Sequence, residues 1–117
     1  MRPTVLIVDD HAAFRASAGA LLEAEGFAVA GEAADCASAI SETERLQPEI
    51  VLLDVQLPGG DGFLVAERLA ASSRPPAVVL TSSRDAATYG PRLVAAAACG
   101  FIPKREISGA ALSALVR

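Results

Sequence analysis

The sequence predicts an α/β fold in one domain, with a parallel sheet that carries helices on both faces. A chain of 117 residues is long enough for one hydrophobic core and too short for two. Five short apolar runs alternate with polar or amphipathic segments, an order typical of buried parallel strands joined by right-handed helical crossovers. The five predicted strands are Thr4–Val8, Phe27–Ala30, Ile50–Leu53, Ala77–Leu80 and Gly100–Ile102.

The segments after the first two strands carry clear helix signals. An apolar stripe with helical spacing follows the first strand, at Phe14, Ala18, Leu21 and Leu22. Gly26 stands where a glycine commonly ends a helix. Asp35 is placed to cap a second helix that runs to about Leu46, just before Gln47 and Pro48.

The helix signals in the second half are weaker. A third helix is predicted from the capping Asp61 to about Ala71. Gly90 and Pro91 would break a continuous fourth helix, whereas proline is well tolerated at a first helical position, so we expect that helix to begin at Pro91. The last, short helix is marked by Ile107, Ala111 and Leu115. We therefore expect the order (βα)5 without repeats or linkers, and a single domain over residues 1–117 with no output domain among them.

Composition and charge exclude several classes of function. The longest stretch without a charged residue, Leu93–Pro103, is about half of the ~20 residues that a membrane-spanning helix needs. No signal-peptide pattern opens the chain, so we expect a cytoplasmic protein without membrane contact. A net charge of −4 works against nucleic-acid binding by this piece. Cys36 and Cys99 lack metal-ligand spacing, and we expect both to be small buried residues.

Polar residues follow four of the five predicted strands, each at the point where a strand ends. Asp9 and Asp10 follow the first strand, Asp54 the third, Thr81 the fourth and Lys104 the fifth. In open parallel sheets, ligands bind beyond the carboxyl ends of the strands. If the strand order is 2-1-3-4-5, a common one in such sheets, the first and third strands are neighbours and the three carboxylates converge.

Such a cluster requires positive charge. At ~4 Å and an effective dielectric constant of about 20, each pair of like charges costs about 4 kcal/mol. Lys104 supplies one positive charge, and a hard divalent cation supplies the other. Mg²⁺ prefers one or two carboxylates together with water and phosphate oxygens. The cluster is therefore expected to bind magnesium and a phosphoryl group.

Each of these residues alone has an ordinary structural explanation. Asp10 resembles a helix N-cap, Thr81 a turn residue, and Lys104 a solvated cation at a sheet edge. Asp54 is harder to explain in this way, because Asp61 is better placed to cap the next helix. Five such residues at one edge of the sheet favour a single site.

Four segments resemble the signature segments of response-regulator receiver domains. They are Val5-Leu6-Ile7-Val8-Asp9-Asp10, Asp54-Val55-Gln56-Leu57-Pro58-Gly59-Gly60-Asp61-Gly62, Leu80-Thr81-Ser82 and Gly100-Phe101-Ile102-Pro103-Lys104. The resemblance covers essentially the whole chain, in order and at the expected intervals. It implies a flavodoxin-like, doubly wound (βα)5 sheet with strand order 2-1-3-4-5, and a phosphorylation switch of a two-component system rather than an enzyme.

The resemblance also implies roles for the site residues. Asp54 is the expected phospho-acceptor. The only reactions that the domain is expected to catalyse are its own phosphorylation and dephosphorylation. Asp9 and Asp10 are expected to hold Mg²⁺ directly or through water, and the ion also takes an oxygen of Asp54 and the backbone carbonyl of Gln56. These roles agree with general chemistry, because an aspartyl carboxylate is a known covalent phosphoryl acceptor.

The remaining implied roles concern the switch. Thr81 and Lys104 are expected to bind phosphoryl oxygens, and Phe101 to move with Thr81 and change the surface of the fourth helix, fifth strand and fifth helix. The expected partners are a sensor histidine kinase, a helix-turn-helix DNA-binding output domain in a longer parent chain, and a second copy in a phosphorylation-dependent dimer. The segments Asp10-His11 and Gly100–Lys104 are similar to the branch that carries such output domains.

One residue beside the motifs carries no assigned role, and the chain departs from the family pattern at two places. His11 is expected at the rim of the pocket, where several residue types would serve. Arg105 follows Lys104 where many receivers have proline, and Gly90-Pro91 shortens the fourth helix of the signalling face.

Two other functions stay open on the sequence. A receiver-shaped docking module that works without phosphorylation would not need all five pocket residues. A haloacid-dehalogenase-like phosphatase also uses a nucleophilic aspartate and Mg²⁺, but its nucleophile follows the first strand in an Asp-x-Asp pattern, and this chain has adjacent aspartates there.

Overall fold

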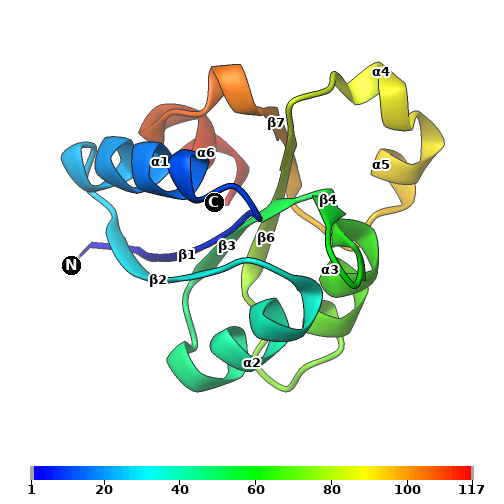
Figure 1. Ribbon diagram of the computed structural model, residues 1–117, viewed down its shortest axis with the longest axis horizontal. Helices are drawn as coiled ribbons and strands as arrows, with labels where there is room; N and C mark the ends of the chain where they lie inside the picture. Colours follow the sequence, from blue (N-terminus) through cyan, green and yellow to red (C-terminus); the bar gives the residue numbers. More distant parts are fainter. Residues whose placement is uncertain (1, 117) are drawn as a thin grey trace.

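The computed structural model describes residues 2–116 and contains the five-stranded parallel sheet that the sequence predicts. The strand order is β2-β1-β3-β6-β7, which corresponds to 2-1-3-4-5 along the chain (Figure 1). The fold is therefore α/β and flavodoxin-like, as expected. The strands are β1 (Thr4–Val8), β2 (Ala28–Ala33), β3 (Ile50–Asp54), β6 (Ala77–Ser82) and β7 (Gly100–Pro103).

Helices cover both faces of this sheet. On one face α1 and α6 pack, and on the other face α2 and α3 pack together with residues of α4 and α5 (Figure 1). Alternate residues of β1 separate the two layers, because Leu6 and Val8 belong to the second core and Val5 and Ile7 to the first. The helices are α1 (Ala12–Ala24), α2 (Cys36–Leu46), α3 (Gly62–Ala70), α4 (Ala86–Tyr89), α5 (Pro91–Ala95) and α6 (Gly109–Leu115), with a 3-10 turn η1 (Lys104–Glu106).

The predicted helix boundaries are largely confirmed by the capping contacts. Gly26 adopts a positive φ of 100° after α1, and the Phe27 N–H donates to the Leu22 carbonyl oxygen, which together close the helix. Asp35 caps α2 by accepting from the Ser38 N–H at 2.7 Å, and Asp61 caps α3 by accepting from the Leu64 N–H at 2.9 Å.

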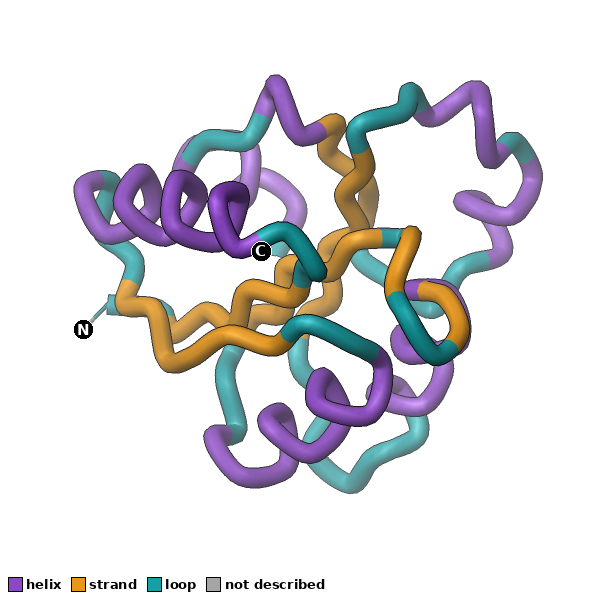
Figure 2. The backbone as a smooth tube through the Cα atoms, viewed as in Figure 1, coloured by secondary structure: helices purple, strands orange, loops and turns teal. Residues whose placement is uncertain are grey.

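The structure differs from the expectations in the second half of the chain. A helix does begin at Pro91, but it is preceded by the separate helical turn α4, so the segment has two short pieces. Ile107 lies outside α6, because Ser108 is the N-cap of that helix; its side chain still packs on the core beneath α6. A small hairpin, β4 (Gln56–Leu57) with β5 (Gly60–Asp61), follows Asp54 and was not expected (Figure 2).

The two cysteines differ from each other in burial. Cys36 is buried at the start of α2, as predicted, but Cys99 is exposed, so the prediction for Cys99 was wrong. The error arises because Cys99 lies in the loop before β7, where the apolar run Leu93–Cys99 is only partly covered.

No helix within residues 2–116 is long and apolar enough to cross a membrane.

Candidate metal-binding and acidic site

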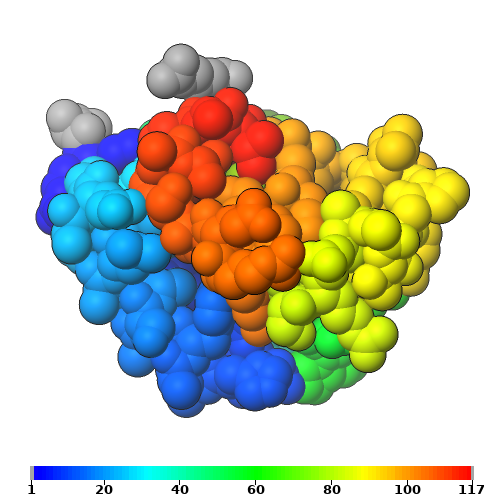
Figure 3. Space-filling view, turned by 90° about the horizontal axis from the view of Figure 1, so that it is seen from above, coloured from blue at the N-terminus to red at the C-terminus, as the bar shows by residue number. Residues whose placement is uncertain are grey.

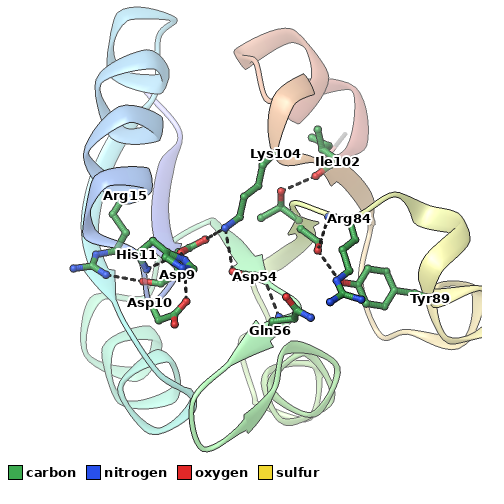
Figure 4. Close-up of polar contacts among 12 residues, drawn as sticks. Asp9, Asp10, His11, Arg15, Asp54, Gln56, Arg84, Tyr89, Ile102 and Lys104 are labelled. Atoms are coloured by element: carbon green, nitrogen blue, oxygen red, sulfur yellow. Dashed lines mark hydrogen bonds and ion pairs between the residues drawn. The ribbon is translucent and has the colours of Figure 1, made fainter.

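The polar residues at the strand ends meet at one edge of the sheet (Figure 4). Asp9 and Asp10 follow β1, Asp54 is the last residue of β3, and Lys104 follows β7. Thr81 lies in β6 and pairs in register with Asp54. The convergence that the sequence predicted is therefore present in the structure.

The end of β3 is shaped by a close backbone contact. Gly62, the first residue of α3, donates its N–H to the Val55 carbonyl oxygen at 2.7 Å. A Cβ atom at this position would lie 2.9 Å from the Cα atom of Val55 and would strike the backbone of Asp54. The glycine thus allows the β4–β5 hairpin to return the chain beside Asp54, while Asp61 caps α3.

Two of the carboxylates are buried and share one ammonium group. The Asp9 and Asp54 residues are 0% and 3% exposed, whereas the Asp10 side chain is 37% exposed. Lys104 Nζ lies 2.5 Å from Asp9 Oδ2 and 3.2 Å from Asp54 Oδ2. Two buried negative charges therefore face a single positive charge, and the site is left with net negative charge.

The two buried carboxyl groups have different pKa values. Burial, together with the neighbouring Asp9 carboxylate, raises the pKa of Asp54 to about 6, although the N–H of Gln56 and the ammonium of Lys104 oppose the shift. Burial also acts to raise the pKa of Asp9, but the Lys104 contact and the His11 N–H outweigh it and hold this pKa below its ordinary value. Asp54 is thus the carboxylate that would gain most from an added cation.

The Lys104 ammonium is itself held from two sides. Its pKa lies above the ordinary lysine value, because the contacts with Asp9 and Asp54 outweigh the opposing effect of burial. Nζ also lies 4.4 Å from the centroid of the Phe14 ring of α1, a distance at which cation–π attraction operates. The lysine is therefore charged and fixed between the two carboxylates.

The loop after β1 is anchored by Arg15 of α1. Its guanidinium donates to the Asp9 carbonyl oxygen at 2.6 Å and pairs with Glu32 Oε1 at 2.7 Å. These contacts join α1 and β2 to the loop. They fix the backbone from which Asp9 and Asp10 project.

His11 lies closer to the acidic cluster than sequence reasoning indicated. It is the N-cap residue of α1, and its Nδ1 lies 3.0 Å from Asp9 Oδ1 and 3.1 Å from Asp10 Oδ1. One ligand atom from each of His11, Asp9, Asp10 and Asp54 lies within 4.8 Å of all the others. The only sequence signal for this was the position of His11 next to the two aspartates.

The donor set fits a hard divalent cation. Three carboxylates offer oxygen ligands from two neighbouring strands. Within the described part of the chain, Asp9 Oδ2 is a buried side-chain oxygen that has no hydrogen bond of acceptable geometry, and its contact with Lys104 is an ion pair. A cation bound to Asp9, Asp10 and Asp54 would neutralise the carboxylate charge that the single Lys104 ammonium leaves unbalanced.

Thr81 does not bond to Asp54 in this structure. Its hydroxyl is fully buried and donates to the Ile102 carbonyl oxygen of β7 at 2.6 Å. Phe101, also in β7, is half-buried and lies beside Tyr89, with ring centroids 6.1 Å apart. The two residues expected to form the switch are thus neighbours of the site without being part of its carboxylate cluster.

Sequence reasoning missed Tyr89 of α4. Its hydroxyl lies 2.6 Å from Ser82 Oγ, and Ser82 is the buried last residue of β6. The Tyr89 ring also meets the Phe63 ring edge-on, with centroids 5.8 Å apart, so it lies between Phe63 and Phe101. The sequence offered no signal for this contact, since Ser82 reads as a turn residue.

Arg105 joins the two loops that flank the site. Its guanidinium, in η1, lies 2.6 Å from Oδ1 of Asp85, which is the N-cap residue of α4. Figure 3 shows the segment around η1 (orange) in contact with the segment that leads from β6 into α4 (yellow-green).

Every peptide bond among the described residues is trans, including the one between Lys104 and Arg105.

At neutral pH and without divalent metal, Asp54→Asn should be more stable than the unchanged protein. The pKa of Asp54 is raised to about 6 from 3.8, so the native state holds this proton more tightly than the unfolded chain. The stability that the proton supplies is complete below about pH 4 and is lost as the pH rises through about 6. Because asparagine cannot ionise, we expect a gap in unfolding free energy of about 2 to 3 kcal/mol above pH 7.

Urea unfolding at a series of pH values measures this gap. A difference between the two proteins that stays constant from pH 4 to pH 8 would contradict the shifted pKa of Asp54.

The comparisons with known proteins agree with the geometry. The family model described as response regulator receiver domain matches residues 5–117. The chain is 32% identical over 101 residues to the DNA-binding transcriptional activator EvgA of Escherichia coli K12, covering 86% of this chain and 50% of that protein. It is 40% identical over 108 residues to protein-glutamate methylesterase/protein-glutamine glutaminase 6 of Anaeromyxobacter dehalogenans, covering 92% of this chain and 31% of that protein. The chain thus spans half or less of these relatives.

Solved structures show the same architecture. The signal receiver domain of the response regulator NarL from Mycobacterium tuberculosis superposes with a TM-score of 0.84 at 32% identity, covering 97% of this chain and 96% of that one. A two-component response regulator of the LuxR family from Aurantimonas sp. SI85-9A1 gives a TM-score of 0.87 at 25% identity, covering 99% of this chain and 86% of that one.

Proposed function

Because this chain belongs to the response regulator receiver domain family, we propose that it is a phosphorylation switch in which Asp54 accepts a phosphoryl group. The observation that carries the proposal is the position of the Asp54 carboxylate at the end of β3, 3.2 Å from Lys104 Nζ and within ligand distance of Asp9 and Asp10. Asp54 is the carboxylate whose pKa is raised, and the addition of cationic charge makes it available as an ionised nucleophile.

We assign the metal ligands to Asp9, Asp10, Asp54 and the backbone carbonyl of Gln56. Mg²⁺ bound there would neutralise charge on the phosphoryl oxygens and on the carboxylates. Asp9 is fixed by the His11 N–H at 2.8 Å and by the Arg15 contact to its carbonyl, so it presents a fixed oxygen. Asp10 is the more exposed carboxylate and lies on the solvent side of the cluster.

Lys104 has a second role in this assignment. In the present state its ammonium bridges Asp9 and Asp54. Phosphorylation removes the one negative charge of the Asp54 carboxylate and adds up to two negative charges on the phosphoryl group. The ammonium then pairs with a phosphoryl oxygen, as an electrostatic stabiliser of the in-line transfer.

The proposal is tested by incubating the protein with acetyl phosphate, a small phosphodonor, and measuring its intact mass. One added phosphoryl group is expected with Mg²⁺, and none when the metal is removed by EDTA. An adduct that forms equally fast in EDTA would contradict the metal-dependent site.

Thr81 and Phe101 are proposed to transmit the switch. In the structure the Thr81 hydroxyl is bonded to the Ile102 carbonyl oxygen, and a new dianion beside it would draw the hydroxyl toward the phosphoryl group. Loss of the Ile102 contact loosens β6 against β7, where Phe101 packs on Tyr89. The surface formed by α4, α5, β7 and α6 then changes.

Thr81→Ala should therefore uncouple the switch and still allow phosphorylation of Asp54, although more slowly. The amide shifts of Phe101 and α4 on adding beryllofluoride, a phosphoryl mimic, should become much smaller than in the unchanged protein. Ser83→Ala, at an exposed neighbouring position, is the matched control. Full-size shifts in Thr81→Ala would rule out the route through Thr81.

The proposed partners follow from the family and from the relatives. The phosphoryl donor is a sensor histidine kinase or a small phosphodonor in the cytoplasm. EvgA is a DNA-binding transcriptional activator and is about twice as long as the matched segment, so we propose a DNA-binding output domain in a longer parent chain. This piece itself carries a net charge of −4 and is not proposed to bind nucleic acid or membranes. A phosphorylation-dependent dimer is a further proposed state.

The two alternative functions have less support. A docking module that works without phosphorylation gives no reason for burying the carboxylates of Asp9 and Asp54. Burying these two charges without a bound cation lowers the stability of the fold. A haloacid-dehalogenase-like phosphatase needs its nucleophile after β1, where the Asp9 carboxylate instead forms an ion pair with Lys104 at 2.5 Å.

A further inference from the structure

His11 makes two contacts that a helix cap does not require. It occupies the N-cap position of α1 without a side-chain hydrogen bond to the helix backbone. Its ring instead turns toward the carboxylates, with Nδ1 3.0 Å from Asp9 Oδ1 and 3.1 Å from Asp10 Oδ1 (Figure 4). The imidazole therefore belongs spatially to the acidic cluster.

The spacing of these atoms matches that of neighbouring ligands around one metal ion. Two ligands bound at right angles with bonds of about 2.1 Å are about 3.0 Å apart, and two opposite ligands are about 4.2 Å apart. The Nδ1 distances to Asp9 and Asp10 have the first value. With an oxygen of Asp54 included, all four ligand atoms lie within 4.8 Å of one another, somewhat more than the second value, so the side chains would close in slightly on one ion.

A second observation, the charge balance of the site, also favours a bound cation. Asp9 is 0% exposed and Asp54 is 3% exposed, and the Asp9 Oδ2 atom is already paired with Lys104 Nζ at 2.5 Å. Lys104 supplies one positive charge to both Asp9 and Asp54. A buried oxygen in this position is stabilised by direct coordination.

We propose that His11 is a nitrogen ligand that makes this site bind borderline transition-metal ions such as Co²⁺, Ni²⁺ and Zn²⁺ more tightly than Mg²⁺. Imidazole suits these ions, whereas Mg²⁺ gains little from a nitrogen ligand and prefers oxygen. Coordination through Nδ1 uses the ring with its proton on Nε2, and the His11 side chain is 69% exposed, so a metal ion can reach it from solvent. The inference rests on the proposed function, because Asp9, Asp10 and Asp54 supply the other ligands.

The test uses Co²⁺ alone, followed by calorimetry and by proton NMR. The chain contains one histidine, so every imidazole signal belongs to His11. We expect Co²⁺ to bind at least about tenfold more tightly than Mg²⁺, and the His11 ring protons to show large hyperfine shifts.

His11→Asn is the informative variant. Asparagine is a good N-cap and places an amide nitrogen near the position of Nδ1, so the contacts to Asp9 and Asp10 are kept while the imidazole ligand is lost. Its Co²⁺ affinity should fall about tenfold or more, and its Mg²⁺ affinity should stay within about twofold. Equal Co²⁺ affinity in the two proteins would overturn the inference, and so would bound Co²⁺ that leaves the His11 ring protons unshifted.

The outcomes separate this inference from the proposed function. Co²⁺ binding and the His11 shifts are read without any phosphodonor. If the unchanged protein fails to be labelled by acetyl phosphate with Mg²⁺, the proposed function fails while the His11 result stands on its own. If labelling with Mg²⁺ succeeds and His11→Asn binds Co²⁺ normally, only the nitrogen ligand is rejected.

Discussion

Lys104→Met should slow the phosphorylation of Asp54 by roughly 10²–10³-fold, the usual cost of removing one fixed positive or donor group from a developing oxyanion. The ammonium lies 2.5 Å from Asp9 and 3.2 Å from Asp54, and its side chain is only 17% exposed. Methionine preserves most of the side-chain length and its packing on Phe14 but removes the charge. The rate is measured with acetyl phosphate and saturating Mg²⁺.

The adjacent cation provides a matched control. Arg105 is exposed and pairs with Asp85 outside the carboxylate cluster, so Arg105→Met removes the same net charge from the neighbouring position. Its rate should stay within about threefold of the unchanged protein, as expected for an exposed ion pair. Equal losses in Lys104→Met and Arg105→Met would show that net charge, and not the position of Nζ, sets the rate.

Asp10→Asn should weaken Mg²⁺ binding and, in consequence, slow the phosphorylation of Asp54. Asp10 contributes one of three carboxylates to the cluster, and removal of a charged ligand should weaken Mg²⁺ binding by at least about tenfold. Because metal ligands must be deprotonated, binding by the unchanged protein should also weaken at acid pH. Calorimetric titration with Mg²⁺ measures both effects.

Asp85→Asn is the control for this experiment, since Asp85 is an exposed aspartate of the neighbouring loop that does not belong to the cluster. It should bind Mg²⁺ normally. If Asp10→Asn binds Mg²⁺ as tightly as Asp85→Asn, Asp10 is not a ligand.

The parallel sheet was predictable because its signal is local and repeated. The run Ile50–Leu53 is apolar on both faces, and in the structure it is the central strand with both faces buried. The end of this strand is marked by a single charged residue, Asp54. Where a strand end coincides with an abrupt change from apolar to charged residues, the residues lie together at one edge of the sheet, as expected.

The strand limits at the carboxyl edge were predicted less well. β3 includes Asp54 and β6 extends through Thr81 and Ser82, because pairing with neighbouring strands continues past the last apolar residue. The apolar pattern that marks a strand in the sequence ends where the side chains become polar. The backbone hydrogen bonds of the sheet continue, because they do not depend on the side chain. Site residues therefore appear as loop residues in the sequence although the sheet fixes their backbone.

Contacts between side chains from distant segments were beyond sequence reasoning. His11 at the N-cap of α1 lies 3.1 Å from Asp10, and Tyr89 in the short turn α4 lies 2.6 Å from Ser82. Neither orientation is coded by a local pattern. Both are set by how the short helices pack on the sheet.

The position of the phosphoryl group tests the central claim most directly. After incubation with acetyl phosphate and Mg²⁺, the protein is digested and the modified peptide is identified by tandem mass spectrometry, with Asp54→Asn and Asp85→Asn treated in parallel. The expected result is one phosphoryl group on Asp54, full labelling of Asp85→Asn and none of Asp54→Asn. Labelling of Asp54→Asn at the unchanged rate, with the group on Asp9 or Asp10, would contradict the assignment of Asp54 as the acceptor.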